Sequence, residues 1–212
     1  MNLFRRIADK LADKNRRKKY DCFMKHLMPT EDTSILDVGG SEKEYRVTAN
    51  ILEKIYPYPE NITVLGVDQY DEFLRRYSKV KIVTYDGGEF PFKNNQFDLC
   101  WCNAVIEHVG NEEQQEYFLN EIKRVSKKAF ITTPNKHFPV ELHTKIILLH
   151  FLPKKIFDKI LTGTGKSWAA GDYMHLLSLS TIKRLLRKCN IDKFKIIKNK
   201  ILGFTVDYVV IF

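Results

Sequence analysis

The stretch SILDVGGS, residues 34–41, decides the fold class. Its apolar first half is typical of a short buried strand, and the adjacent glycines are typical of a tight turn. Further apolar runs follow at residues 64–68, 81–87 and 97–103, and helix-length spacers separate the first of these runs. Short apolar strands that alternate with helices predict a parallel sheet with right-handed crossovers.

Acidic residues lie at or near the carboxyl ends of the first predicted strands. They are Asp37, Asp68 and Asp86. Open α/β sheets bind ligands outside the carboxyl ends of their strands, near the point where the strand order reverses. Carboxylates at that edge suit a ligand that carries hydroxyl and amino groups, such as a nucleoside.

The order of these motifs resembles that of class I S-adenosylmethionine-dependent methyltransferases, in particular the small-molecule "type 11" subgroup. The resemblance covers residues 35–135 and rests on the order and spacing of its motifs, one of which is FDLCWCNAVIEHV at 97–109. EFPF at 89–92, FLNEIKRV at 118–125 and AFITTPN at 129–135 also match. The resemblance implies a Rossmann-like, seven-stranded, mostly parallel sheet. It also implies an antiparallel last strand, helices on both faces and a helical lid insertion after the fifth strand.

The length of 212 residues suits one α/β domain with additions. Residues 1–30 are expected to form a basic amphipathic helical cap, and residues 31–212 the methyltransferase domain. An apolar insertion at about 137–175 interrupts the alternation of strands and helices, so we expect it to form a lid over the acceptor site. A crossover helix is expected at 42–55, and a helix with Ser180 as its N-cap at 180–188.

The resemblance assigns residues to an S-adenosylmethionine site. Asp68 would accept both ribose hydroxyls, Asp86 the adenine amino group, and Asp37 would help to hold the methionine end. For the glycine pair and the Asp-Gly-Gly segment, an ordinary turn without a ligand stays the alternative. The complete assigned set is Asp37, Gly39, Gly40, Ser41, Asp68, Gln69, Asp86, Gly87, Asn103 and Ala104.

The glycine turn departs from the family pattern. Ser41 stands where the family usually has its second glycine, and Lys43 where it often has a third. A dinucleotide site is disfavoured, because a pyrophosphate cradle needs the full GxGxxG pattern.

A general base is needed only if the acceptor must lose a proton. His108 and His143 are the candidates for that role, and packing or surface roles are the favoured alternatives for both. No metal is expected, because Asn103 and Ala104 stand where related metal-dependent enzymes carry acids.

The net charge of +9 favours anionic partners without distinguishing them. The basic N-terminal helix suits an anionic membrane surface, and nucleic acid is an alternative partner. No apolar run approaches the ~18 residues of a membrane span, and no signal-peptide core is evident. A cytoplasmic protein is therefore expected, with peripheral contact at the inner membrane face left open. The scattered cysteines are expected to be reduced thiols.

The sequence therefore predicts methyl transfer from S-adenosylmethionine to a small-molecule or lipid- or glycan-linked acceptor, most simply at oxygen. A short segment of the insertion suggests polysaccharide biosynthesis. An RNA methyltransferase and a non-catalytic binding or scaffold protein of the same fold remain as alternatives.

Overall fold

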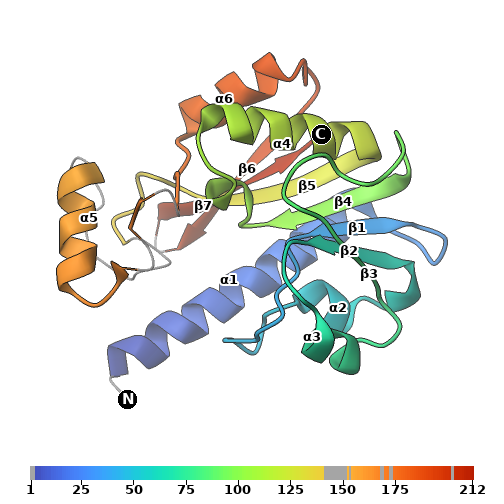
Figure 1. Ribbon diagram of the computed structural model, residues 1–212, viewed down its shortest axis with the longest axis horizontal. Helices are drawn as coiled ribbons and strands as arrows, with labels where there is room; N and C mark the ends of the chain where they lie inside the picture. Colours follow the sequence, from blue (N-terminus) through green and yellow to red (C-terminus); the bar gives the residue numbers. More distant parts are fainter. Residues whose placement is uncertain (1–2, 141–151, 153, 168–169, 172–173, 202) are drawn as a thin grey trace. The chain divides into compact units, whose positions relative to one another are not determined.

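Figure 1 shows the computed structural model and its elements. Within the described part of the chain, strands form a seven-stranded sheet in the order β3-β2-β1-β4-β5-β7-β6. The described residues are 3–140, 152, 154–167, 170–171, 174–201 and 203–212. The strands are β1 (Ile35–Val38), β2 (Ile62–Gly66), β3 (Lys81–Thr84), β4 (Phe97–Asn103), β5 (Ser126–Pro134), β6 (Lys195–Ile201) and β7 (Phe204–Ile211).

The strand pairing confirms the predicted Rossmann-like sheet. β1 pairs in parallel with both β2 and β4, and β2 pairs in parallel with β3, whereas β6 and β7 are antiparallel. The helices are α1 (Leu3–Leu27), α2 (Ile51–Ile55), α3 (Asp71–Arg76), α4 (Glu112–Val125), α5 (Lys154–Gly163) and α6 (Leu179–Lys188), with short 3-10 turns at Pro59–Asn61 and Ile106–His108.

The chain forms two compact units. The first comprises Met1–Cys102 and Lys123–Phe130, and the second Asn103–Ile122 and Ile131–Phe212. Every residue of β1 is buried, as expected for a central parallel strand that is covered on both faces.

The second half of α1 packs onto the core of the first unit. Phe23 is fully buried, and its ring meets Trp101 and Phe130 edge-on at centroid distances of 5.2 and 5.5 Å. Trp101 and Phe130 are themselves stacked at 5.2 Å. Leu11, nearer the start of the helix, is 40% exposed. The C-terminal half of α1 therefore packs on the core of the first unit, and the role of the helix as a cap stays a prediction.

The cysteines are free thiols: Cys100, Cys102 and Cys189 are buried, and Cys22 is half-buried. None of the helices in the described part of the chain combines the length and the apolarity that a bilayer crossing needs.

In the second unit, α6 begins earlier than the sequence predicts. Ser178 is extended, and its hydroxyl oxygen accepts a hydrogen bond from the backbone N–H of Thr181 at 3.1 Å. Ser178 is therefore the N-cap, and the expectation for Ser180 was wrong because Ser180 already lies inside the first turn.

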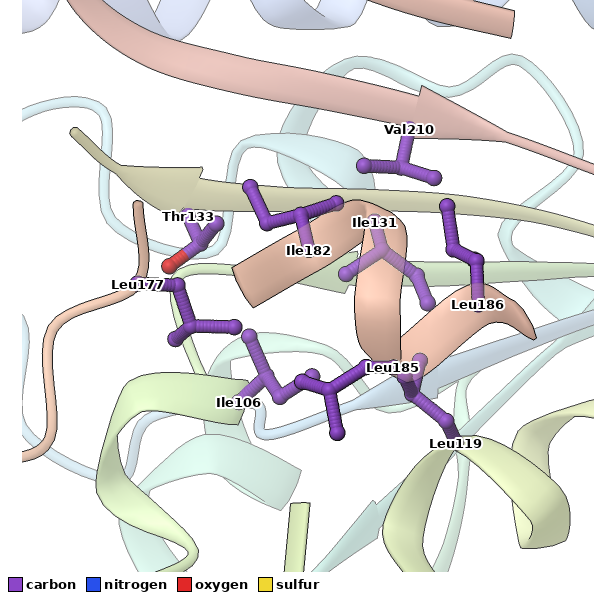
Figure 2. Close-up of a pocket in the computed structure, with 9 residues that line it drawn as sticks. All are labelled: Ile106, Leu119, Ile131, Thr133, Leu177, Ile182, Leu185, Leu186 and Val210. Carbon is purple, nitrogen blue, oxygen red and sulfur yellow. The ribbon is translucent and has the colours of Figure 1, made fainter. Parts of the chain in front are cut away.

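Figure 2 shows the apolar layer that α6 helps to form within the second unit. The side chains enclose a cavity of about 10 Å³, which has room for one water molecule at most. Such a small, apolar space is a packing gap and offers no ligand site. Its lining is Ile106, Leu119, Ile131, Thr133, Leu177, Ile182, Leu185, Leu186 and Val210.

The predicted insertion at 137–175 contains α5, and its role as a lid stays a prediction. Residues 141–151 lie outside the described residues. The candidate base His143 is among them.

A charged anchor fixes the start of β1 in the first unit. The Asp98 carboxylate accepts hydrogen bonds from the Ser34 backbone N–H at 3.0 Å and the Ser34 hydroxyl at 2.7 Å. Lys127 lies 2.7 Å from the other carboxylate oxygen. The hydrogen bond from Lys127, followed by those from Ser34, lowers the pKa of Asp98 to about 2.

This anchor predicts a pH-dependent effect of Asp98→Asn. Because the folded-state pKa is depressed, the carboxylate stabilises the fold above its unfolded pKa of about 4, and this contribution is lost as pH falls toward about 2. Urea unfolding should show the variant to be less stable than the wild type near neutral pH. The difference between their free energies of unfolding should narrow below about pH 4. The exposed Asp32→Asn change serves as the control. A difference in the free energy of unfolding that stays constant down to about pH 3 would contradict this account.

Candidate functional site

The glycine turn after β1 depends on two glycines for different reasons. Gly39 has a φ of 93°, a conformation that side chains disfavour, and its N–H donates to the carbonyl of Leu65 at 2.9 Å. At Gly40, an added Cβ would lie 2.6 Å from Cγ1 of the buried Val64. The first glycine is therefore required by the backbone and the second by packing.

Tyr70 ties the turn after β1 to the loop after β2. Its hydroxyl donates to the carbonyl of Gly40 at 2.9 Å. The ring crosses Gly66, where an added Cβ would lie 1.6 Å from the Tyr70 hydroxyl oxygen. Gly66 thus leaves the space through which Tyr70 reaches the glycine turn.

Glu42 makes a second tie between the same two loops. Its carboxylate accepts from the backbone N–H groups of Glu72 at 2.8 Å and Phe73 at 2.9 Å, at the start of α3. Arg76, at the end of α3, donates back to the Glu42 carbonyl. Glu42 therefore satisfies two N–H groups of the first turn of α3 from outside the helix.

The sequence predicts a helix from residue 42, but Asn50 holds the segment before it in a different conformation. The helix forms only over Ile51–Ile55, since Asn50 is left-handed at φ 50° and its side chain bridges back to Ser41. Its amide oxygen accepts from the Ser41 N–H at 2.9 Å, and its amide nitrogen donates to the Ser41 carbonyl at 2.8 Å. Ser41, the departure from the family pattern, is thus fixed through its backbone.

The other predicted residues of the first unit follow β2 and β3. Asp68 and Gln69 are exposed, and the neighbouring Val67 is 64% exposed. Asp86 is also exposed, and its carboxylate accepts from the Gly88 N–H at 2.9 Å, which closes a turn.

The strand register explains why these loops meet. Val38 pairs with Leu65, and Gly66 pairs with Thr84, so the carboxyl ends of β1, β2 and β3 share one edge. The structure therefore gathers the following predicted residues at one edge of the first unit: Asp37, Gly39, Gly40, Ser41, Asp68, Gln69, Asp86 and Gly87.

Asn103 and Ala104 belong to the second unit. Thr132 donates from its hydroxyl to the Asn103 side-chain oxygen at 2.7 Å, and its carbonyl accepts from the Ala104 N–H at 2.9 Å. Ala104 has a φ of 59°, an uncommon conformation for a residue with a Cβ. The end of β4 is therefore held in a locally strained shape.

Glu107 and His108 follow in the same unit. Glu107 is fully buried; its carboxylate accepts from the Thr133 hydroxyl at 3.1 Å, and its carbonyl accepts from the His175 N–H at 2.7 Å. His108 ends a 3-10 turn and is half-buried. These contacts give Glu107 a structural role, and the assignment of His108 as a base stays a prediction.

The residues that sequence reasoning missed all support the glycine turn. Tyr70 and Glu42 act through partners that lie 30 or 31 residues away along the chain, so a single sequence gives little sign of them. One signal was available: Glu53 interrupts an apolar run in the short helix α2, where a buried charge is unusual. The missed residues are Glu42, Asn50, Glu53, Gly66 and Tyr70.

The pKa values of three acids in the first unit are shifted by their surroundings. Asp37 and Glu53 are each only 5% exposed. Burial, followed by the adjacent carboxyl of Glu53, raises the pKa of Asp37 well above its usual range. Burial also raises the pKa of Glu53. For Glu44, burial works in the opposite direction to its hydrogen bonds, but the bonds from Lys54, Tyr77 and Asn50 prevail and lower its pKa.

Comparison with known families agrees with this geometry. Residues 46–129 match the family model described as "Methyltransferase domain". A solved S-adenosylmethionine-dependent methyltransferase from Methanosarcina mazei has 16% sequence identity and a TM-score of 0.53, with 89% of this chain and 95% of that chain covered. The chain is similar to S-adenosylmethionine-dependent methyltransferases. This confirms the resemblance expected from the sequence.

Other methyltransferase structures share the fold. One from Aquifex aeolicus has 15% identity and a TM-score of 0.53, with 90% of this chain and 87% of that chain covered. The 1,6-didemethyltoxoflavin-N1-methyltransferase of Burkholderia thailandensis, solved with S-adenosylhomocysteine, has 15% identity and a TM-score of 0.56, with 93% and 76% covered. A search of curated protein sequences gave no significant match.

The packing at Gly40 predicts that Gly40→Ala damages the turn. The added methyl group would press on Val64 in the core, so we expect a loss of about 1–3 kcal/mol in the free energy of unfolding. Gly163→Ala is the matched control, because an added Cβ there meets nothing within 4 Å. Equal unfolding midpoints for the two variants would show that the turn has more room than this packing implies.

Proposed function

We propose that the chain binds S-adenosylmethionine at the carboxyl edge of β1, β2 and β3 and transfers its methyl group to a small-molecule acceptor. The observation that carries the proposal is the gathering of Asp37, Asp68 and Asp86 at the carboxyl ends of adjacent parallel strands, beside a glycine turn. The match of residues 46–129 to a methyltransferase domain supports it. The Burkholderia relative is a methyltransferase solved with S-adenosylhomocysteine, and its shared fold is a further support.

The exposed groups fit the chemistry of the cofactor. A carboxylate at Asp68 next to the exposed apolar Val67 suits a nucleoside, which has polar ribose hydroxyls and a flat base. Asp68 would accept from both hydroxyls, and Gln69 would lie along the adenine edge. Asp86 and Gly87 would meet the adenine amino group and a ring nitrogen. Asp37 and the glycine turn would hold the methionine end. The cofactor-binding role that the resemblance implies for Asn103 and Ala104 stays a prediction.

The cofactor, when bound, supplies a methyl group on a sulfonium, which an acceptor attacks in line. The protein therefore needs mainly to hold donor and acceptor in position and to exclude water. His108 and His143 are the proposed bases for an acceptor that must lose a proton, and an oxygen acceptor is the simplest case. Because positioning is the main requirement, a site that consists mostly of binding residues is compatible with this reaction.

Asp68→Asn tests the cofactor site. Because asparagine has one acceptor oxygen in place of two and carries no charge, it cannot accept from both hydroxyls as a carboxylate does, and the Kd for S-adenosylmethionine measured by calorimetry should rise by about ten- to a hundredfold. Asp71→Asn, an exposed change at the start of α3, is the matched control and should bind like the wild type. Absence of binding by the wild-type protein would refute the proposed function and favour a non-catalytic scaffold of this fold.

The acceptor class is a further proposal. Sugars and lipid-linked glycans come first in a screen for methyl transfer, because the predicted insertion is apolar and resembles that of polysaccharide-pathway methyltransferases. RNA is the alternative acceptor that the charge of +9 supports. Methylation of RNA, with binding that falls steeply as salt is raised, would favour it over a glycan.

Peripheral membrane contact is proposed for α1. Lys10, Lys14 and Lys18 are exposed and recur every four residues, so they share one face of the helix. Anionic lipid attracts each such charge by about 1 kcal/mol, so reversing all three to Glu should weaken binding to anionic vesicles by at least about a hundredfold.

A variant with the same change in charge at exposed positions elsewhere, Lys183, Lys193 and Lys195, is the control. It should keep most of the vesicle binding. Equal losses in the two variants would mean that the general positive charge, and not α1, attracts the lipid. Localisation at the inner face of a membrane would follow only from a loss that is specific to α1.

A further inference from the structure

Two carboxyl groups lie buried side by side in the first unit. Asp37 near the end of β1 and Glu53 in α2 are each 5% exposed, and each contributes to the electrostatic environment of the other. Within the described residues, neither carboxyl oxygen of Glu53 has a hydrogen bond of good geometry. Such a buried pair is costly if both groups are ionised, since a charge out of water needs a compensating partner.

The groups around the pair compensate its charge only in part, because the attraction of Lys54 for Glu53 is opposed by the carboxylate of Glu44. Lys54 donates to the Glu44 carboxylate at 2.8 Å and to the Val47 carbonyl at 2.9 Å, and the lowered pKa of Glu44 keeps that acid ionised. The tyrosines and the thiol that face the pair have raised pKa values, chiefly through burial, and stay neutral near neutral pH. The titratable groups facing Asp37 or Glu53 are Glu44, Lys54, Tyr70, Tyr77 and Cys100.

Two close carboxyl groups in such surroundings hold one proton between them, because the second ionisation is opposed by the first. Resting on the proposed function, we propose that Glu53 is a positioning residue that accepts this shared proton from Asp37 when the ammonium group of S-adenosylmethionine binds beside Asp37.

The step is balanced within the site. The proton moves from a carboxyl oxygen of Asp37 to a carboxyl oxygen of Glu53, and the ammonium group keeps its own protons and its charge. Asp37 then meets the ammonium group as a carboxylate, and Glu53 is neutral in its buried place. Because the proton stays inside the protein, cofactor binding near neutral pH neither releases a proton to solvent nor depends strongly on pH.

Calorimetry with S-adenosylhomocysteine tests this role, because this ligand has the ammonium group and lacks the sulfonium. The working range is about pH 5.5–6.5, which lies more than one unit below the pKa of about 7.7–8 of an α-amino group, so the ligand stays protonated. Two buffers with different ionisation enthalpies give the number of protons released. For the wild type we expect a Kd that changes by less than about twofold over this range, with almost no proton release.

In Glu53→Met the proton has no acceptor inside the protein, and Asp37 must release it to solvent. The Kd should therefore rise by about tenfold for each pH unit below the raised pKa of Asp37, with release of about one proton. Methionine is expected to be tolerated, because replacing a buried acid with an apolar group of similar size is often neutral or stabilising. Thermal melting verifies that the variant is folded.

Glu53→Gln separates this role from packing. Glutamine is similar in size to methionine, but its amide can donate to the Asp37 carboxylate and thereby favour the ionised form. It should restore binding near pH 6 to within about threefold of the wild type. The uncharged ligand 5′-methylthioadenosine, which lacks the amino-acid end, is the ligand control, and its Kd should be the same in all three proteins.

The outcomes distinguish this inference from the proposed function. If the wild type binds S-adenosylhomocysteine and Glu53→Met shows the same flat pH profile, Glu53 has no part in placing the proton, and the cofactor site stands without it. Equal weakening in the Met and Gln variants would mean that Glu53 acts only through packing. If neither S-adenosylhomocysteine nor S-adenosylmethionine binds to the wild type at any pH, the proposed function itself fails.

Discussion

The central constraint on the first unit is the burial of the Asp37 carboxyl beneath the turn that follows β1. An acid in this position is costly to ionise, and its surroundings must be held in place for it to be useful to a ligand. Three side chains hold these surroundings in place. The Asn50 side chain hydrogen-bonds to the backbone of Ser41, the Tyr70 hydroxyl donates to the carbonyl of Gly40, and the Glu42 carboxylate caps α3.

These ties make the loops after β1 and β2 one assembly. The exposed acid at Asp68 is followed within two residues by Tyr70, which is anchored on the glycine turn, so the two loops are positioned by the same contacts. A site for an extended ligand needs several groups at fixed separations, and loops are the more mobile parts of a fold. Joining the loops by side chain to backbone bonds supplies that rigidity without adding regular structure.

The sequence was sufficient for the strands and for the edge at which the acids gather, because short apolar runs and glycine turns are local patterns. It was insufficient for residues 42–50, where a helix was expected. There, hydrogen bonds between the Asn50 side chain and the Ser41 backbone take the place of helical backbone hydrogen bonds. Tyr70 and Glu42 also went unnoticed, since their partners lie 30 or 31 residues away along the chain. The periodicity of apolar residues reflects local structure and does not reveal such contacts.

The crossing of Tyr70 over Gly66 has an evolutionary consequence. Any side chain at position 66 would occupy the place of the tyrosine hydroxyl, so keeping both would require Tyr70 to move away from the Gly40 carbonyl. A lineage that replaces Gly66 therefore loses the reason to keep Tyr70, and one that loses Tyr70 is free to fill position 66. Among homologues the two positions should therefore covary as a pair. A homologue that lacks both would have to join its two loops by another bond.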